Sequence, residues 1–329
     1  MKKLVCLVLA IVMLMAMAVC ASAEWPERKI TFICPWGVGG GADSTIRPMA
    51  QLLQEILGVP VEIQNVTGGS GVMGVEEAWK QPDDGYTFML GTQSLDIQDM
   101  LGNTSMNFKD DMKCINVLVH SINSIVASKV QMEKYGVTNW AELQAYMAEH
   151  PWEVSAAMLT AGGVDGASLM DALDGLEVNL VAYNSGSDAN SALVGGHCDL
   201  YVCGWDDVAG LIESGDIIPI LALCENRMSI APDLQCSAEN GIDSYMGPWR
   251  GIFCKSTVDQ AIIDKLNAAI QQAKETETWK TFCANAAYDQ RPVPQPGVET
   301  DEFVQNEYKA LRDYLLEQGQ LVKDYDDLK

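Results

Sequence analysis

Short apolar runs alternate with amphipathic stretches along most of the chain. Apolar runs bounded by turn residues predict buried strands, and apolar residues at every third or fourth position predict helices. Strands are predicted over Ile30–Cys34, Val61–Gln64, Thr87–Leu90, Val154–Leu159, Glu177–Ala182 and Ile217–Cys224. Helices are predicted over Ser44–Leu57, Val72–Trp79, Trp140–His150, Ser168–Leu173, Ala261–Lys274 and Phe303–Gln318. This alternation is typical of an α/β protein with mostly parallel sheets.

The first residues carry a different pattern. Lys2 and Lys3 precede an uncharged apolar run from Leu4 to Val19, and Ala21-Ser22-Ala23 follows as a cleavage pattern of small residues. This arrangement predicts an export signal over residues 1–23 and a periplasmic protein. The alternative is a lipid anchor on Cys20, which Val19 disfavours because a small residue is expected there. No later apolar run is long enough to cross a bilayer.

Cleavage after Ala23 would leave about 306 of the 329 residues, enough for two domains. No linker rich in Pro, Ser or Gly divides them, so we expect the chain to cross between the domains more than once. Loss of Lys2 and Lys3 moves the net charge from −24 to −26, which argues against nucleic acid or an anionic membrane as a partner.

The mature chain would keep eight cysteines. They show no Cys-x-x-Cys pair and no dense spacing, and several lie in apolar runs, so we expect mostly buried free thiols. Cys198 and Cys203 are the pair to inspect for a disulfide. None of the three histidines has partners at ligand spacing, so neither a metal site nor a cofactor is expected.

Two glycine-rich turns between a strand and a helix are the strongest functional signal. The first is Pro35-Trp36-Gly37-Val38-Gly39-Gly40-Gly41-Ala42-Asp43, and the second is Asn65-Val66-Thr67-Gly68-Gly69-Ser70-Gly71. Glycine allows a close approach of the backbone to a ligand, and amides at a helix start attract anions. A single turn would favour a plain loop, but two in succession favour a receptor for small anions.

The ordered motifs resemble the TctC-like solute-binding proteins, also called Bug receptors, which serve tripartite tricarboxylate transporters. The resemblance covers nearly the whole mature chain. Its residues are Pro35-Trp36-x-x-Gly39-Gly40-x-x-Asp43, Asn65-x-x-Gly68-x-x-Gly71, Pro82-Asp83-x-Gly85-Tyr86-Thr87, Tyr183-Asn184-x-Gly186, Gly195-Gly196-His197-x-Asp199, Trp249-x-Gly251-Ile252-Phe253 and Ile263-x-Lys265-Leu266-Asn267.

The resemblance implies an α/β fold of two lobes, the Venus-flytrap architecture of type II periplasmic binding proteins, closing on a small carboxylate. By analogy, one lobe holds residues 24–122 and 248–329, and the other holds 123–247. It implies a monomer that hands its ligand to membrane transporter subunits. The expected ligand-binding residues are Trp36, Val38, Gly39, Gly40, Gly41, Asp43, Thr67, Gly68, Gly69, Ser70, Gly71, Gly163, Asp165, Tyr183, Asn184 and Asp206.

The chain departs from the family pattern in three places. Asp84 lengthens the Pro-Asp-Gly turn, no histidine occurs between Ala161 and Asp174, where the helix looks short, and Asn184 replaces a frequent lysine. With Asp165 near the cleft, these changes make a ligand with a neutral or amino-bearing far end more plausible.

Structural roles compete with the binding roles at several of these positions. Asp43 is expected to cap the helix at Ser44–Thr45 and to pair with Arg47 four residues on. Thr67 and Ser70 could equally donate to a ligand or stabilise their turn. We expect Arg250 to be solvated, Asp206 and Asp207 to form an exposed loop pair, and His197 to lie on a surface turn.

Two alternative functions are weighed for this sequence. A sensory module for a signalling partner would use the same lobes and ligand. An exported hydrolase is disfavoured, because no Gly-x-Ser-x-Gly motif occurs and no histidine stands in a recognisable catalytic motif.

Overall fold

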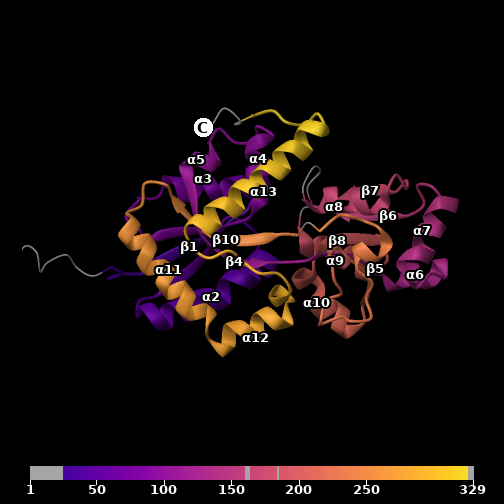
Figure 1. Ribbon diagram of the computed structural model, residues 1–329, viewed down its shortest axis with the longest axis horizontal. Helices are drawn as coiled ribbons and strands as arrows, with labels where there is room; N and C mark the ends of the chain where they lie inside the picture. The colour runs from indigo at the N-terminus through magenta and orange to yellow at the C-terminus, as the bar shows by residue number, and fades with distance from the viewer. Residues whose placement is uncertain (1–24, 160–163, 184, 246, 325–329) are drawn as a thin grey trace, which may run out of the picture.

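The computed structural model describes residues 25–159, 164–183, 185–245 and 247–324. They form two lobes, each built on a five-stranded mixed sheet flanked by helices, which confirms the predicted α/β class (Figure 1). The predicted export signal and Cys20 lie outside the described residues. Within those residues, no helix is long and apolar enough to cross a membrane.

The sheet of lobe 1 has the strand order β2-β1-β3-β10-β4. Its strands are β1 (Ile30–Cys34), β2 (Val61–Asn65), β3 (Thr87–Gly91), β4 (Met112–His120) and β10 (Trp249–Lys255). Strand β1 runs parallel to β2 and β3, and β10 runs antiparallel to β3 and β4. The helices are α2 (Gly41–Leu57), α3 (Val72–Lys80), α4 (Gln93–Met100), α5 (Phe108–Asp111), α11 (Gln260–Lys274), α12 (Glu277–Asn285) and α13 (Val298–Glu317).

The sheet of lobe 2 has the order β7-β6-β8-β5-β9. Its strands are β5 (Asn123–Ser128), β6 (Ser155–Met158), β7 (Asn179–Ala182), β8 (Leu200–Gly204) and β9 (Ile217–Ala222). The parallel strands are β6, β7 and β8, and β5 runs antiparallel to β8 and β9. The helices are α6 (Lys129–Tyr135), α7 (Trp140–Glu149), α8 (Val164–Leu173), α9 (Gly186–Val194) and α10 (Trp205–Ser214).

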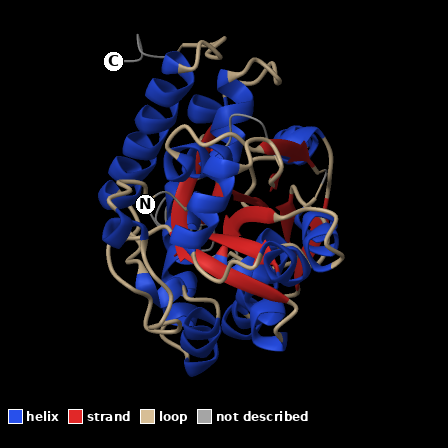
Figure 2. Cartoon of the chain, turned by 90° about the vertical axis from the view of Figure 1, so that its right-hand side faces the viewer, coloured by secondary structure: helices blue, strands red, loops and turns tan. Residues whose placement is uncertain are grey.

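Each lobe has its own apolar core. In lobe 1 the face of α2 with Ile46, Met49 and Leu53 packs on the sheet and on α11, and all three side chains are fully buried. In lobe 2 Trp140 and Leu143 of α7 are fully buried against β5 and β8. Helices therefore cover the sheets on their outer sides, as Figure 2 shows.

The helix predicted at Ser168–Leu173 begins earlier in the structure. Helix α8 starts at Val164 and includes Asp165 in its first turn, so the expectation of a short helix is wrong. Helix α2 likewise begins at Gly41 and not at Ser44, because the glycines of the turn continue into helical geometry. These shifts bring turn residues onto helix starts, where their amides point away from the helix.

Two segments cross between the lobes. The chain leaves β4 through Ser121 into β5 and returns through Pro248 into β10, and the Ser121 amide donates to the Pro248 carbonyl at 2.8 Å. A Cβ on Gly247 would lie 2.1 Å from the Ser121 carbonyl oxygen, so only glycine fits between the crossings. Arg291 donates to the carbonyls of Leu223 and Tyr245 beside them. The lobe boundaries, at residues 24–122 plus 248–329 and at residues 123–247, stay a prediction.

The eight cysteines from Cys34 to Cys283 are free thiols, seven buried and Cys283 half-buried. Cys198 and Cys203 do not pair. In the described residues, no group of three or more His, Cys, Asp or Glu side chains could hold a metal ion.

Candidate ligand-binding site

The carboxyl ends of the parallel strands in each lobe lead into helix starts. In lobe 1, β1, β2 and β3 lead into the two glycine turns and α4, and in lobe 2, β6, β7 and β8 lead into α8, α9 and α10. Ligands of open α/β sheets bind outside these strand ends. Contacts between the first turns of α10 and α2 show that the two edges face each other.

Asp43 organises the first glycine turn, which spans residues 35–41. Its buried carboxylate accepts a hydrogen bond from the Gly39 amide at 3.0 Å and two from Arg47 at 2.7 Å. Asn65 joins it from the end of β2, donating to Asp43 Oδ1 at 2.8 Å and to the Trp36 carbonyl at 2.9 Å. The Asp43–Arg47 pair confirms the expected i,i+4 contact.

The pKa of Asp43 reflects this network. Burial raises the pKa, but hydrogen bonds from Arg47, the Gly39 amide and Asn65 outweigh it, so the pKa lies below the ordinary value. The expected cap at Ser44–Thr45 is wrong, because Gly40 is the N-cap residue and the Asp43 carboxylate accepts the amide of Gly39 instead. Asp43 is therefore ionised and held inside the turn.

The second glycine turn has an unusual backbone. Residues Gly68, Gly69, Ser70 and Gly71 have φ values of +136°, +56°, +53° and +102°. Glycine allows this backbone, and successive turn amides of this kind are available to an anion when no acceptor of the protein binds them. The amides of Thr67, Gly68, Gly69 and Ser70 make no hydrogen bond to any described residue. Thr67 and Ser70 are exposed.

The two turns pack directly against each other. A Cβ on Gly71 would lie 3.4 Å from Trp36 Cζ2 and 3.5 Å from Pro35 Cβ, and a Cβ on Gly74 would lie 2.7 Å from Pro35 Cα. Trp36 is half-buried between the turns, and Val38 is 73% exposed at the tip of the first. The structure thus brings together the lobe 1 residues that the sequence predicted.

An ion-pair cluster lies at the junction of the lobes. Asp206 at the start of α10 pairs with Arg250 of β10 at 2.9 Å and accepts a hydrogen bond from Ser121 Oγ at 2.5 Å. Arg250 is only 4% exposed, donates to the Tyr288 hydroxyl at 2.7 Å and approaches Asp207 to 3.6 Å. The expectations of a solvated Arg250 and an exposed aspartate pair are wrong, because Arg250 is buried and the side chains of Asp206 and Asp207 are only 4% and 21% exposed at the lobe contact.

Asp207 reaches across to the first glycine turn. A Cβ on Gly41 would lie 2.1 Å from Asp207 Oδ1 and 2.7 Å from Asp206 Oδ2, so the carboxylates stand at the start of α2. Burial, then Asp206, raises the pKa of Asp207 to about 7 against the lowering effects of Arg250 and the Gly41 amide. The first turn is therefore already occupied by this protein's own carboxylates.

The remaining predicted residues of lobe 2 are partly placed. Asp165 Oδ1 accepts a hydrogen bond from Asn123 at 3.1 Å, and burial raises the pKa of Asp165 to about 6. Tyr183 follows β7 and packs on the cluster that includes Ala189 and Cys198. Gly163 and Asn184 lie outside the described residues. His197 is exposed in a turn, as expected.

Sequence reasoning missed several polar residues of this junction, namely Gln93, Ser121, Asn123, Tyr201, Tyr288 and Asp207 as a partner of Arg250. Gln93 is 1% exposed, donates to the Gly247 carbonyl at 3.0 Å and accepts from the Trp249 amide at 3.2 Å. Of these residues, Asn123 and Tyr201 lie in strands beside apolar residues. A polar residue inside a buried run is the one signal that could have found them.

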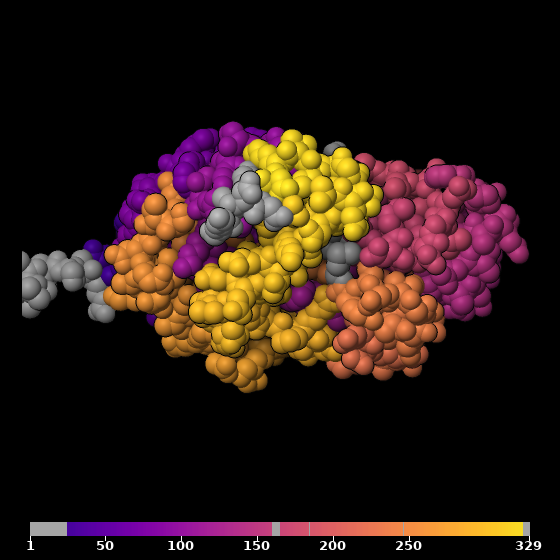
Figure 3. Space-filling view, turned by 45° about the horizontal axis from the view of Figure 1, so that its top comes forward, coloured from indigo at the N-terminus to yellow at the C-terminus, as the bar shows by residue number. Residues whose placement is uncertain are grey.

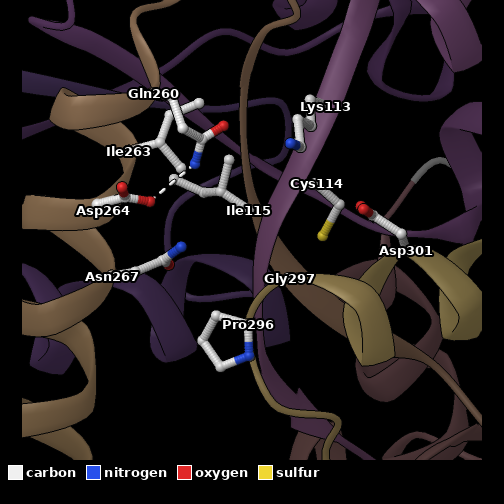
Figure 4. A pocket seen from close by; sticks show the side chains of 10 residues that line it. All are labelled: Lys113, Cys114, Ile115, Gln260, Ile263, Asp264, Asn267, Pro296, Gly297 and Asp301. Atoms are coloured by element: carbon white, nitrogen blue, oxygen red, sulfur yellow. Dashed lines mark hydrogen bonds between the residues drawn. The ribbon is translucent and has the colours of Figure 1, made fainter.

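A cavity lies on lobe 1, away from the glycine turns. It has a volume of about 200 Å³ between β4, α11 and the segment before α13, with Lys113, Asp264 and Asp301 at its sides (Figure 4). Asp264 accepts a hydrogen bond from Gln260 at 2.8 Å there. Because none of its lining residues belongs to the glycine turns or to α10, this cavity serves as a control region for the site at the junction.

Comparison with known proteins identifies the family. The family model described as "Tripartite tricarboxylate transporter family receptor" (TctC) matches residues 45–319. The chain belongs to this family. It is similar to protein BugT of Bordetella pertussis, with 26% identity over 91% of this chain and 92% of BugT. The residue motifs that resembled TctC-like proteins therefore identified the family correctly.

Solved structures of periplasmic binding proteins share the fold of this TctC-family chain. BugD gives a TM-score of 0.80 at 20% identity, covering 91% of this chain and all of BugD. MatC from Rhodopseudomonas palustris with bound malate gives 0.76 at 20% identity, covering 88% and 100%. A further R. palustris protein with adipate gives 0.78 at 22% identity, covering 90% and 99%.

Proposed function

We propose that this protein is an exported, monomeric receptor that captures a small organic carboxylate between its lobes and delivers it to a transporter of the tripartite tricarboxylate type. The second glycine turn carries the proposal, since four successive amides there have no partner among the described residues. A carboxylate bound to these amides would gain charge-assisted hydrogen bonds.

The family and its structures support this ligand class. The R. palustris neighbours hold malate and adipate, which are both small dicarboxylates. Expected contacts come from Trp36, Val38 and the turn from Thr67 to Gly71 in lobe 1, and from Asp165, Tyr183, Asn184 and Asp206 in lobe 2. Trp36 and Val38 offer apolar surface beside the amides, which suits the carbon chain of such a ligand.

Closure around the ligand would use the crossing segments described above. Ser121, Gly247 and Pro248 lie in contact at the crossings, and Arg291 ties them to the C-terminal segment. In Figure 3 the two lobes lie side by side and adjoin each other. A ligand that touches both lobes would stabilise the closed arrangement by its contacts to each.

A thermal-shift screen of the mature protein tests the proposal. Mono-, di- and tricarboxylates, amino carboxylates and aromatic acids are compared at one ionic strength. At one hundred times its Kd, a bound ligand stabilises the folded protein by about 2.7 kcal/mol, and we expect at least one carboxylate to do so. Alcohols and amines of matched size are the controls. A screen in which no carboxylate raises the Tm would contradict the proposal.

A further inference from the structure

Three carboxylates gather at the carboxyl edge of the lobe 2 sheet. Asp165 lies in the first turn of α8, and Asp206 and Asp207 lie in the first turn of α10. Asn123 connects the two helix starts, because it pairs with Gly204 across the β5–β8 ladder and donates to Asp165. The carboxylate charges influence one another, since Asp165 and Asp206 both raise the pKa of Asp207.

Arg250 is the cation that acts on this cluster. It pairs with Asp206 at 2.9 Å and lies 3.6 Å from Asp207 Oδ1, while the carboxylate of Asp165 is bonded to Asn123. One guanidinium against three carboxylates leaves an excess of negative charge in a buried region. Such an excess is costly unless a proton or a positive group compensates it.

Two buried polar groups at the same edge lack partners. Asn123 is fully buried, and its Oδ1 accepts no hydrogen bond although its Nδ2 donates to Asp165 and Ser168. Tyr201 is fully buried as well, its hydroxyl is unpartnered, and it lies within the field of Asp165, Asp206 and Asp207. A Cβ on Gly186 at the start of α9 would lie 3.4 Å from that hydroxyl.

These groups share one chemistry. The carboxylates of Asp165 and Asp207 and the amide oxygen of Asn123 are all hydrogen-bond acceptors, and the Tyr201 hydroxyl can accept as well. The buried Asn123 Oδ1, which has no donor, calls for a ligand that brings an N–H group, and the excess charge calls for a positive one. A primary ammonium supplies both, with three donors on one positive nitrogen.

We propose that this acidic edge of lobe 2 binds the ammonium group of a zwitterionic amino carboxylate whose carboxylate rests on the second glycine turn. The inference rests on the function proposed above and narrows its ligand class. The inference also explains why the first turn would not bind a second carboxylate of the ligand. Asp206 and Asp207 already face Gly41 there and repel another anionic group. A dicarboxylate would place its far charge against these residues.

The same carboxylates could instead serve only to hold the lobes together through Arg250. In that case they would raise the affinity of every ligand that needs closure, whatever its charge. A binding role predicts a dependence on the charge of the far end of the ligand. The two explanations therefore separate in a series of ligands that differ only at that end.

Isothermal titration calorimetry on the mature protein provides the first test. The probes are matched sets: 4-aminobutyrate, succinate and butyrate, then 5-aminopentanoate, glutarate and pentanoate. In the set whose chain length binds more tightly, we expect the amino compound to bind at least tenfold more tightly than the dicarboxylate and the monocarboxylate of the same length. A dicarboxylate that binds as tightly as the amino compound would overturn the inference and leave the proposed function standing. If neither these probes nor any acid of the thermal-shift screen binds, both the inference and the proposed function are wrong.

Variants provide the second test. Asp165→Asn keeps the shape and removes one charge, and we expect it to weaken amino-compound binding at least tenfold while monocarboxylate binding changes less than twofold. Asp264→Asn removes an equal charge beside the lobe 1 cavity and should leave both affinities unchanged. Equal weakening of both ligand types by Asp165→Asn would show a general role in closure and overturn the inference. Thermal unfolding of each variant confirms that it is folded.

Discussion

The two glycine turns of lobe 1 come from similar stretches of sequence, yet their amides have different surroundings. In the first turn, Asp43 accepts the Gly39 amide, and Asp207 of lobe 2 faces Gly41. In the second turn, the amides from Thr67 to Ser70 have no partner among the described residues. Glycine content alone therefore does not separate a turn that stabilises the structure from one that is open to a ligand.

The difference follows from what each turn contacts. The first turn is tied by Arg47 and Asn65 to the end of β2 and meets α10 across the lobe junction. The second turn passes through four successive residues with positive φ, and no described residue accepts its amides from Thr67 to Ser70. A turn that is bound by side chains gains rigidity, and a turn that is left unbound keeps its donors for another molecule.

The largest effect is expected from Gly69→Val. Gly69 has φ of +56°, and its missing Cβ would lie 3.4 Å from Val72, so valine distorts the open turn. We expect ligand affinity to fall at least a hundredfold, measured by calorimetry with the best ligand of the screen.

Gly58→Val is its matched control. Gly58 has φ of +70° at the end of α2 and nothing within 4 Å of its missing Cβ. Both variants carry the left-handed strain, about 1–2 kcal/mol for a residue with a side chain. If Gly58→Val weakens binding as much as Gly69→Val, the second turn is not the anion site.

Asp43→Ala is expected to act on stability. Its removal leaves the Gly39 amide and Asn65 without their acceptor and Arg47 without its partner. We expect a loss of about 2 kcal/mol in the free energy of unfolding, measured by urea denaturation, because four hydrogen bonds to a buried carboxylate are lost. Arg28→Ala removes one partner of a largely exposed ion pair with Asp84 and should cost at most about 1 kcal/mol. Equal losses would show that the first turn is not held by its network.

The smallest effect concerns pH. Burial raises the pKa of Asp207 above its ordinary value, so the folded state binds more protons than the unfolded state between those two values. Wild-type stability therefore falls as pH rises through the folded pKa, and Asp207→Asn lacks this contribution. From pH 5.5 to 8 we expect the Tm of wild type to drop by about 2–4 °C relative to Asp207→Asn.

Differential scanning fluorimetry measures this difference, and Asp84→Asn on the surface of lobe 1 is the control. The comparison of two variants cancels the titration of other groups, among them Asp96 and His120. A constant difference in Tm between wild type and Asp207→Asn would show that Asp207 stays charged at the first turn throughout this range.

Most of the secondary structure could be predicted because its signals are local. The strand at Ile30–Cys34 and the helix at Ala261–Lys274 agree with β1 and α11 within one residue. The start of α8 was misplaced, because Val164 and Asp165 follow a glycine-rich stretch that reads as a turn. Strands β4, β5, β8 and β10 escaped the pattern because both of their faces are buried and show no alternation.

The order of motifs in the chain was enough to establish the family and the α/β class, because strand, turn and helix signals each depend on a few neighbouring residues. Local signals of this kind could not predict which turn amides already have a partner in the protein. Arg250 meets Asp206 from 44 positions away, and Asp207 meets Gly41 from 166 positions away. Contacts between such distant residues arise when the lobes pack together, and they decide which amides are occupied and which charges are buried.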